Sequence, residues 1–168
     1  MKTRFPLVPL FVAALLAGCG QKAPSAATAA TAPPAPAAPA PVGPRVIEIT
    51  GNDQMKFSVT AIEVKVGEEI KVVLKNVGTL PKQAMGHNWI LLKMGSDAAA
   101  FSAAAVAALD KDYIPDSHKD QVIVHTKLLG PNETEAVTFK LTAAGEYPFL
   151  CSFPAHFMVG MKGVITAK

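Results

Sequence analysis

The sequence predicts an all-β fold, a sandwich of short strands with one inserted helix, between residues 45 and 168. Apolar runs of four to six residues recur there between turns rich in Gly, Pro and Asn, as in β-sandwiches and barrels. This part of the chain, 124 residues, also has the size of one domain. The expected strands cover residues 46–49, 62–66, 70–74, 88–92, 122–125, 136–141, 147–150 and 163–167.

One segment interrupts the strand pattern. Residues 96–109 are rich in alanine, the strongest helix former, and Ser96 or Asp97 is placed to cap a helix N-terminus. We therefore expect a short helix, inserted between two strands and packed against the sandwich.

The N-terminal residues 1–18 have the pattern of a secretory signal peptide. A basic start precedes an apolar run that is too short to be a convincing membrane span. The run ends in Leu-Ala-Gly-Cys at 16–19, which resembles a bacterial lipobox and implies cleavage before Cys19 and lipid attachment to its thiol. In the usual sorting pattern of bacterial lipoproteins, a residue other than aspartate after the lipidated cysteine, here Gly20, implies the outer membrane. We therefore expect the domain on the periplasmic face of that membrane. An ordinary signal peptide that contains a cysteine is the alternative.

Residues 19–44 form the expected tether. From Gly20 to Pro44 the chain is almost wholly Ala, Pro, Thr and Ser, a composition that builds no core. In a polyproline conformation these residues would reach roughly 75 Å. The tether either lets the domain sample partners or acts as a simple spacer.

Charge and cysteine usage limit the function further. Without the leader's Lys2 and Arg4, the chain has 14 basic and 13 acidic residues, which argues against nucleic acid as a partner. The chain has two cysteines, and lipidation of Cys19 would leave Cys151 without a disulfide partner in an oxidising compartment. A bound metal would account for this single free thiol.

A short C-terminal stretch has the composition of a metal site. Residues 151–161 contain the thiol of Cys151, the imidazole of His156 and the thioethers of Met158 and Met161, and His87 supplies a second imidazole upstream. One thiolate, two imidazoles and a weak thioether form the ligand set of a blue-copper site. One loop between two strands can present Cys151, His156 and Met161 to a single point.

Three other interpretations of this stretch are possible. Its Met and Cys residues could fill the core. Zinc could bind Cys and two His, although a hard or thiolate fourth ligand would be more usual. A Cys–His nucleophilic pair would need an oxyanion donor set and an orienting carboxylate, and the sequence shows neither.

Several short strings resemble those of the azurins: residues 51–55, 85–89, 109–113, 125–127 and 161–163. The resemblance runs from about residue 46 to residue 168. It implies a cupredoxin, a Greek-key β-sandwich with one type 1 copper. The implied ligands are His87, Cys151 and His156 in the equatorial plane, Met161 as the axial ligand and the Gly86 carbonyl as a weak contact.

The chain departs from the azurin pattern in three ways. The loop from His156 to Met161 is one residue longer than is typical and is closer to that of the auracyanins. Ala155 replaces a glycine, and the azurin disulfide is missing.

Two groups of residues are expected around the copper. Asn88 could hold the Cys151 loop and tune the sulfur, or could be an ordinary capping residue, and Phe153 is a second neighbour of the site. The ring edge of His156 should lie near solvent within an apolar docking patch. We expect this patch to contain Met55, Leu80, Met85, Phe157 and Met158. His125 resembles a surface histidine of azurins, but a satisfied strand histidine is as good an interpretation.

These observations favour a lipid-anchored electron carrier that cycles one copper between Cu(II) and Cu(I). Its expected partners are redox proteins such as c-type cytochromes or terminal reductases and oxidases. We expect no enzymatic activity, because four ligands fill the copper site and the sequence shows no acid–base cluster. The alternative function is a periplasmic protein that stores or delivers copper, which should have a more exposed site.

Overall fold

The computed structural model describes residues 43–168. The predicted signal peptide, Cys19 and nearly all of the predicted tether lie outside these residues. Among the described residues, no helix combines the length and the apolar character needed to cross a membrane.

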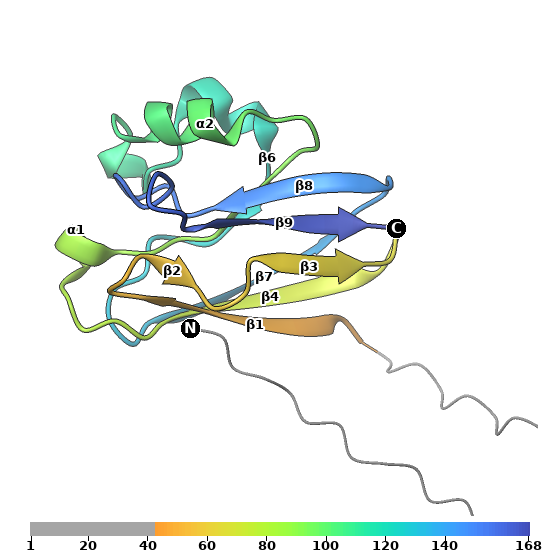
Figure 1. The fold of residues 1–168 in the computed structure, drawn as a ribbon, viewed down its shortest axis with the longest axis horizontal. Coiled ribbons are helices and arrows are strands. Elements are labelled where there is room, and N and C mark those ends of the chain that lie inside the picture. Colours follow the sequence, from red (N-terminus) through yellow and green to blue (C-terminus); the bar gives the residue numbers. More distant parts are fainter. Residues whose placement is uncertain (1–42) are drawn as a thin grey trace, which may run out of the picture. The chain divides into compact units, whose positions relative to one another are not determined.

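Two sheets form a β-sandwich (Figure 1). The first sheet, in the order β2-β1-β4-β7, consists of β1 (Arg45–Asn52), β2 (Lys56–Phe57), β4 (Glu69–Asn76) and β7 (Thr134–Lys140). The second, in the order β3-β9-β8-β5-β6, consists of β3 (Ala61–Val64), β9 (Lys162–Ala167), β8 (Gly145–Leu150), β5 (Ile90–Leu92) and β6 (Val122–His125). The strand pairs β1–β4 and β3–β9 are parallel, and the other pairs are antiparallel. The predicted sandwich is confirmed, and β2 is the strand that the prediction missed.

The strands of the sandwich follow the alternation of apolar side chains. In β4, Ile70, Val72 and Leu74 are fully buried, whereas the residues between them are more exposed. Because successive side chains of a strand point to opposite faces, this period of two directs one face of the sheet into the core. The centre of the core is aromatic: the ring centroid of Trp89 lies 5.4 Å from that of Phe149 and 6.0 Å from that of Phe139.

Strand β5 is buried on both faces. Leu91 belongs to the main core between the sheets, while Ile90 and Leu92 belong to a second apolar cluster with Phe101 of α2 (Ala98–Ala105). The helical insertion therefore packs on the outward-facing residues of β5. Figure 1 shows α2 next to β8, on the side away from the first sheet.

The inserted helix is shorter than predicted. Asp97 is its N-cap, because the carboxylate accepts hydrogen bonds from the backbone N–H groups of Ala99 and Ala100 at 2.9 and 3.0 Å. The helix ends at Ala105 and not at residue 109, and residues Leu109–Lys111 form a separate 3-10 turn, η1. The structure also contains α1 (Lys82–Met85) and the 3-10 helix η2 (Asp116–Gln121), which the sequence did not predict.

A left-handed turn follows the 3-10 turn η1. Asp112 and Tyr113 have φ angles of +53° and +61° and turn the chain back toward the sandwich. Their carbonyl groups accept hydrogen bonds from Asn88 and Ser152 in other parts of the fold. These hydrogen bonds attach the end of the helical insertion to the rest of the fold.

Candidate metal centre

Three potential metal donors, His87, Cys151 and His156, converge at one end of the sandwich. The Nδ1 atoms of His87 and His156 lie 3.3 Å apart, and Nδ1 of His156 lies 3.4 Å from Sγ of Cys151. All donor atoms of this group lie within 4.8 Å of one another, and all three side chains are buried. Cys151 and His156, which lie 64 and 69 residues after His87 in the chain, therefore meet it at one point.

The ligand loop, defined here as residues 151–161, is a compact turn. Its ends are joined because the N–H of Cys151 donates to the carbonyl of Met161 at 3.0 Å. Inside the loop, the N–H of His156 donates to the carbonyl of Phe153 at 3.1 Å, and the N–H of Met161 donates to the carbonyl of His156 at 2.9 Å. These bonds turn the His156 side chain back toward Cys151.

His87 reaches the site from outside the ligand loop. It follows Gly86, the C-cap of α1, and is paired to Leu129 by backbone hydrogen bonds of 3.0 and 2.7 Å. A Cβ atom on Gly86 would lie 2.7 Å from the Lys82 carbonyl oxygen and 2.8 Å from Leu128 Cγ, so only glycine fits here without a shift. The backbone before His87 is thus closely packed.

Met161 and Gly51 complete the buried side of the site. Met161 is fully buried and immediately precedes β9, whereas Met158 at the tip of the ligand loop is 78 % exposed. A Cβ atom on Gly51 would lie 2.9 Å from Met161 Cε and 3.0 Å from His87 Cδ2. This role of Gly51 was not predicted from the sequence. The sequence offers one indication of it: a glycine inside a strand often marks a position where another group packs closely against the backbone.

Burial determines the charge state of the three donors. It raises the pKa of the Cys151 thiol to about 12, against the effect of hydrogen bonds from the backbone of Asn88 and Phe153. Burial, with a smaller contribution from His87, lowers the pKa of His156 to about 4. Both imidazoles are therefore neutral at pH 7 and able to bind a metal, while the thiol must lose its proton as the metal binds.

Burial also lowers the pKa of His87, and two neighbours act in the opposite direction. They are the backbone carbonyl of Asn52 and the carboxylate of Asp53. The Nε2 atom of His87 nevertheless has no hydrogen bond of normal geometry. Nδ1 of His87 faces Nδ1 of His156, so Nε2 is the ring nitrogen left to interact with the Asn52 carbonyl. This arrangement favours Nδ1 as the metal-binding atom.

The donor geometry fits one metal ion. Metal bonds of about 2.0 Å to nitrogen and 2.3 Å to sulfur place neighbouring donor atoms of a trigonal or tetrahedral site roughly 3.3–3.7 Å apart. The separations of 3.3 and 3.4 Å in this site are of that size. A buried thiol, two neutral imidazoles and a nearby thioether favour copper over zinc, which prefers a harder or thiolate fourth ligand.

Asn88 connects the segment that carries His87 to the ligand loop. Its side-chain oxygen accepts from the N–H of Ser152 at 2.9 Å, and its Nδ2 donates to Ser152 Oγ at 2.9 Å and to the Asp112 carbonyl at 2.8 Å. Ser152 Oγ in turn donates to the Tyr113 carbonyl at 2.8 Å. Asn88 therefore uses its whole amide to join three segments, and it is not an ordinary helix cap.

Two predictions for the surroundings of His156 were wrong. Phe157 is only 7 % exposed and belongs to the second apolar cluster, so it is not part of an exposed patch. His156 is 1 % exposed, so its ring edge does not reach solvent as expected. The ring of Phe153 lies against it at a centroid distance of 4.7 Å and contributes to this cover.

The other predicted patch residues are closer to the surface. Met55 and Met85 are half-buried, and Leu80 is 43 % exposed. The N–H of Leu80 lies 3.4 Å from Asp53 Oδ1, near the turn between β1 and β2 that contains Met55. Met55 and Leu80 therefore lie at one turn, whereas Met85 ends α1, two residues before His87.

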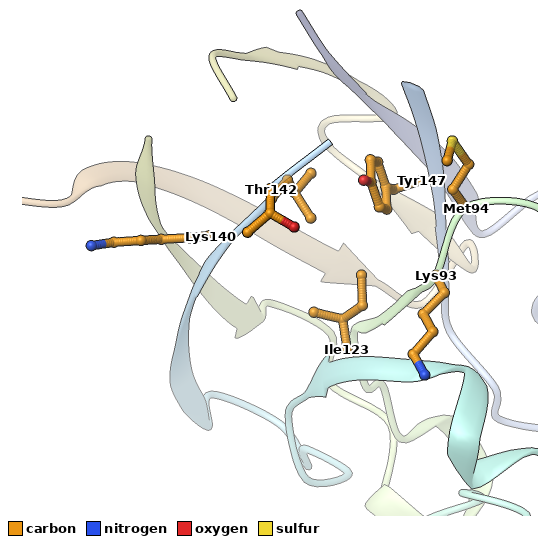
Figure 2. Close-up of a pocket in the computed structure, with 7 residues that line it drawn as sticks. Lys93, Met94, Ile123, Lys140, Thr142 and Tyr147 are labelled. Atoms are coloured by element: carbon orange, nitrogen blue, oxygen red, sulfur yellow. The ribbon is translucent and has the colours of Figure 1, made fainter. Parts of the chain in front are cut away.

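Two further features lie apart from the donors. His125 is exposed, and its Nδ1 lies 3.0 Å from the carbonyl oxygen of Thr126. A cavity of about 380 Å³ lies near the start of β8 and is lined by Lys93, Met94, Ile123, Lys140, Leu141, Thr142 and Tyr147. Figure 2 shows that the ammonium groups of Lys93 and Lys140 point away from each other, so they do not form one anion site.

Comparison with known proteins defines the class to which this fold and site belong. Residues 45–168 match the family described as copper binding proteins, plastocyanin/azurin family. The chain belongs to this family, and it is a copper protein with a cupredoxin fold.

Its relatives within the family include azurins. The chain is 44% identical to azurin of Pseudomonas denitrificans over 126 residues, which cover 73% of this chain and 97% of that protein. It is 42% identical to azurin of Pseudomonas aeruginosa strain PAO1 over 127 residues, or 73% and 84% of the two chains. With the His–Cys–His site, these relatives identify a blue-copper electron-transfer protein.

Solved structures of auracyanins have the same fold. The reduced auracyanin of Roseiflexus castenholzii superimposes with a TM-score of 0.66 at 36% identity, over 75% of this chain and 99% of that chain. Auracyanin B superimposes with a TM-score of 0.64 at 28% identity, over 74% and 88% of the two chains. The predicted resemblance to azurins, with a similarity to auracyanins, is confirmed.

Proposed function

We propose that His87, Cys151 and His156 would hold the copper as its three strong ligands, with the Met161 thioether as a weaker fourth ligand and the Gly86 carbonyl as a weak further contact. The observation that carries this proposal is the convergence of one thiol and two neutral imidazoles next to a buried thioether. When bound, copper supplies a one-electron couple between Cu(II) and Cu(I). The protein's own residues hold the donors in place and exclude water.

Burial of the donors favours an electron carrier over a copper-delivery protein. The side chains of His87, Cys151, His156 and Met161 are at most 1 % exposed. Delivery of copper to an acceptor requires an accessible site that exchanges its ligands, whereas electron transfer requires a site that changes little between the two oxidation states. With four ligands in place, no position stays open for a substrate, so we propose no enzymatic activity.

Replacement of Met161 by glutamine should lower the reduction potential, because an amide oxygen favours Cu(II) over Cu(I). We expect a decrease of at least about 60 mV, which corresponds to a tenfold change in relative affinity for a one-electron couple. Met158→Gln is the matched control and should leave the potential nearly unchanged, since Met158 is exposed. Voltammetry of both variants measures the two shifts in reduction potential. A larger shift for Met158→Gln than for Met161→Gln would mean that Met158, and not Met161, is the thioether ligand.

The electron is proposed to leave across the surface around the turn between β1 and β2. Leu80, Met158 and Val159 have exposed apolar side chains, and Met55 in this turn and Met85 at the end of α1 are half-buried. A partner that covers this surface would come close to the buried His156. The proposed partners are redox proteins such as c-type cytochromes or terminal reductases and oxidases.

Met85→Lys should slow electron self-exchange by about tenfold or more without changing the absorption spectrum. The added charge must lose water when two copies meet, and about 1.4 kcal/mol of extra cost slows the reaction tenfold. Thr142→Lys, in the exposed loop before Gly145, is the control and should have little effect. Equal self-exchange rates in wild type and Met85→Lys, measured by NMR line broadening, would exclude this surface.

The domain is further proposed to be tethered to the periplasmic face of the outer membrane. The lipobox-like stretch 16–19 and the Ala/Pro-rich residues behind it support this proposal. The acyl chains of a lipidated cysteine exceed the two signals that stable anchoring requires, at about 0.8 kcal/mol per buried CH₂ group.

Cys19→Ser should abolish labelling of the protein by radioactive fatty acid and release it from the membrane fraction. The substitution removes the only atom of Cys19 that can carry the thioether lipid. Fractionation of cells that express the wild type and the variant measures this effect. A wild-type protein found entirely in the soluble fraction would contradict the anchor.

A further inference from the structure

The tip of the ligand loop has few connections to the rest of the fold. Residues 154–160 are held mainly by local turn bonds, such as those from Val159 N–H to the Ala155 carbonyl at 3.2 Å and from Gly160 N–H to the Phe157 carbonyl at 3.1 Å. Within residues 43–168, one hydrogen bond joins this backbone to a segment that is distant in sequence. In it, Nζ of Lys56 donates to the Val159 carbonyl at 2.6 Å.

The loop leaves room for this ammonium group at Gly160. A Cβ atom at this position would lie 3.1 Å from Lys56 Nζ, closer than a side chain normally approaches. Gly160 also has a φ angle of +99°, which L-residues rarely adopt. Both the space and the backbone conformation at Gly160 therefore allow Lys56 to reach the neighbouring carbonyl.

The strand that carries Lys56 is itself attached to the metal site. In the short pairing of β1 with β2, Lys56 lies opposite Asn52, and its N–H donates to Asn52 Oδ1 at 3.3 Å. The adjacent pair contains Gly51, which packs directly against His87 and Met161. The Lys56 side chain thus links the loop tip to the segment that supports two of the metal donors.

The opposite side of the loop is fixed by a different contact. Phe157 is buried in the second apolar cluster, and Lys162 Nζ lies 4.2 Å from the centroid of its ring. Between these two attachment points, Met158 is 78 % and Val159 is 44 % exposed. The exposed tip is therefore held on one side by Phe157 and on the other by Lys56.

We propose that Lys56 is a positioning residue that holds the ligand loop against the β1–β2 turn and so keeps His156 in place for copper. This inference rests on the copper function proposed above. A hydrogen bond from an ammonium group to a carbonyl is stronger than one between neutral groups, but water weakens it at an exposed position. Lys56 therefore restricts the motion of the loop and adds little to global stability.

Hydrogen exchange of the loop amides in the metal-free protein tests the contact itself. Lys56→Met should speed exchange at Val159 and Gly160 by about twofold to fivefold, the range for an exposed charged hydrogen bond. Lys56→Arg should restore slow exchange because it keeps a charged donor. Lys65→Met, at an exposed lysine outside the ligand loop and the β1–β2 turn, should have no effect on these amides.

Release of copper to an excess of chelator tests the consequence for the site. Lys56→Met should release copper about twofold to fivefold faster, with an unchanged unfolding temperature of the metal-free protein. Unchanged loop exchange in Lys56→Met, or an equal increase in Lys65→Met, would overturn the proposal. Faster loop exchange in a chain that binds no copper would support the role of Lys56 in holding the loop and contradict the copper function.

Discussion

Cys151→Ser is expected to abolish the intense red absorption band of the copper-loaded protein. The band requires charge transfer from a thiolate to Cu(II), and Cys151 is the free thiol of the described domain. Copper affinity should fall by more than about 100-fold, because even the outer partners of metal ligands typically account for 10- to 100-fold. The variant should still fold, since serine is close to cysteine in size. Optical titration with Cu(II) and circular dichroism measure the two effects.

The same substitution at the other cysteine is the control for this prediction. Cys19→Ser should retain the full band, because Cys19 belongs to the predicted lipid anchor and not to the copper site. An intense red band that survives in Cys151→Ser would show that another residue supplies the thiolate or that the band has a different origin.

Asn88→Ala should have the second-largest effect, on both stability and the copper site. The change removes all three hydrogen bonds of the amide and leaves the Ser152 N–H and the Asp112 carbonyl without their partners. An unsatisfied buried group costs about 1–3 kcal/mol, so we expect a loss of about 3 kcal/mol in the free energy of unfolding. The reduction potential should also change, because the residue next to Cys151 is no longer held.

A double-mutant cycle with Ser152→Ala separates this network from a general packing effect. Because the two side chains share one hydrogen bond, the effects of the single substitutions should not add in the double variant. Denaturant unfolding of the four proteins provides the measurement. Additive effects, or a loss below about 0.5 kcal/mol for Asn88→Ala, would mean that Asn88 does not join the segments as the structure indicates.

The strands and the ligand loop were predictable because they depend on local patterns. Alternation of apolar residues located eight strands, and residues 122–125 form β6 as expected. Likewise, Cys151, His156 and Met161 lie in one short stretch, so a single turn was enough to bring them together.

The remaining features depend on contacts between distant segments. The alternation of apolar residues could not predict that Phe157 is buried. Phe157 is buried because it packs with Phe101 of α2 and Ile90 of β5 in the second apolar cluster. The role of Gly51 depends on the parallel pairing of β1 with β4 and on the position of His87. The left-handed turn at Asp112 similarly follows from hydrogen bonds to residues from elsewhere in the fold.

An optical titration of the wild-type protein with Cu(II) tests the central claim, a blue-copper site built from His87, Cys151 and His156. We predict an intense red band that saturates at one copper per chain, disappears when a reductant is added and returns on reoxidation. A titration that produces only the weak bands of copper bound to nitrogen and oxygen, or that saturates at another stoichiometry, would contradict the claim.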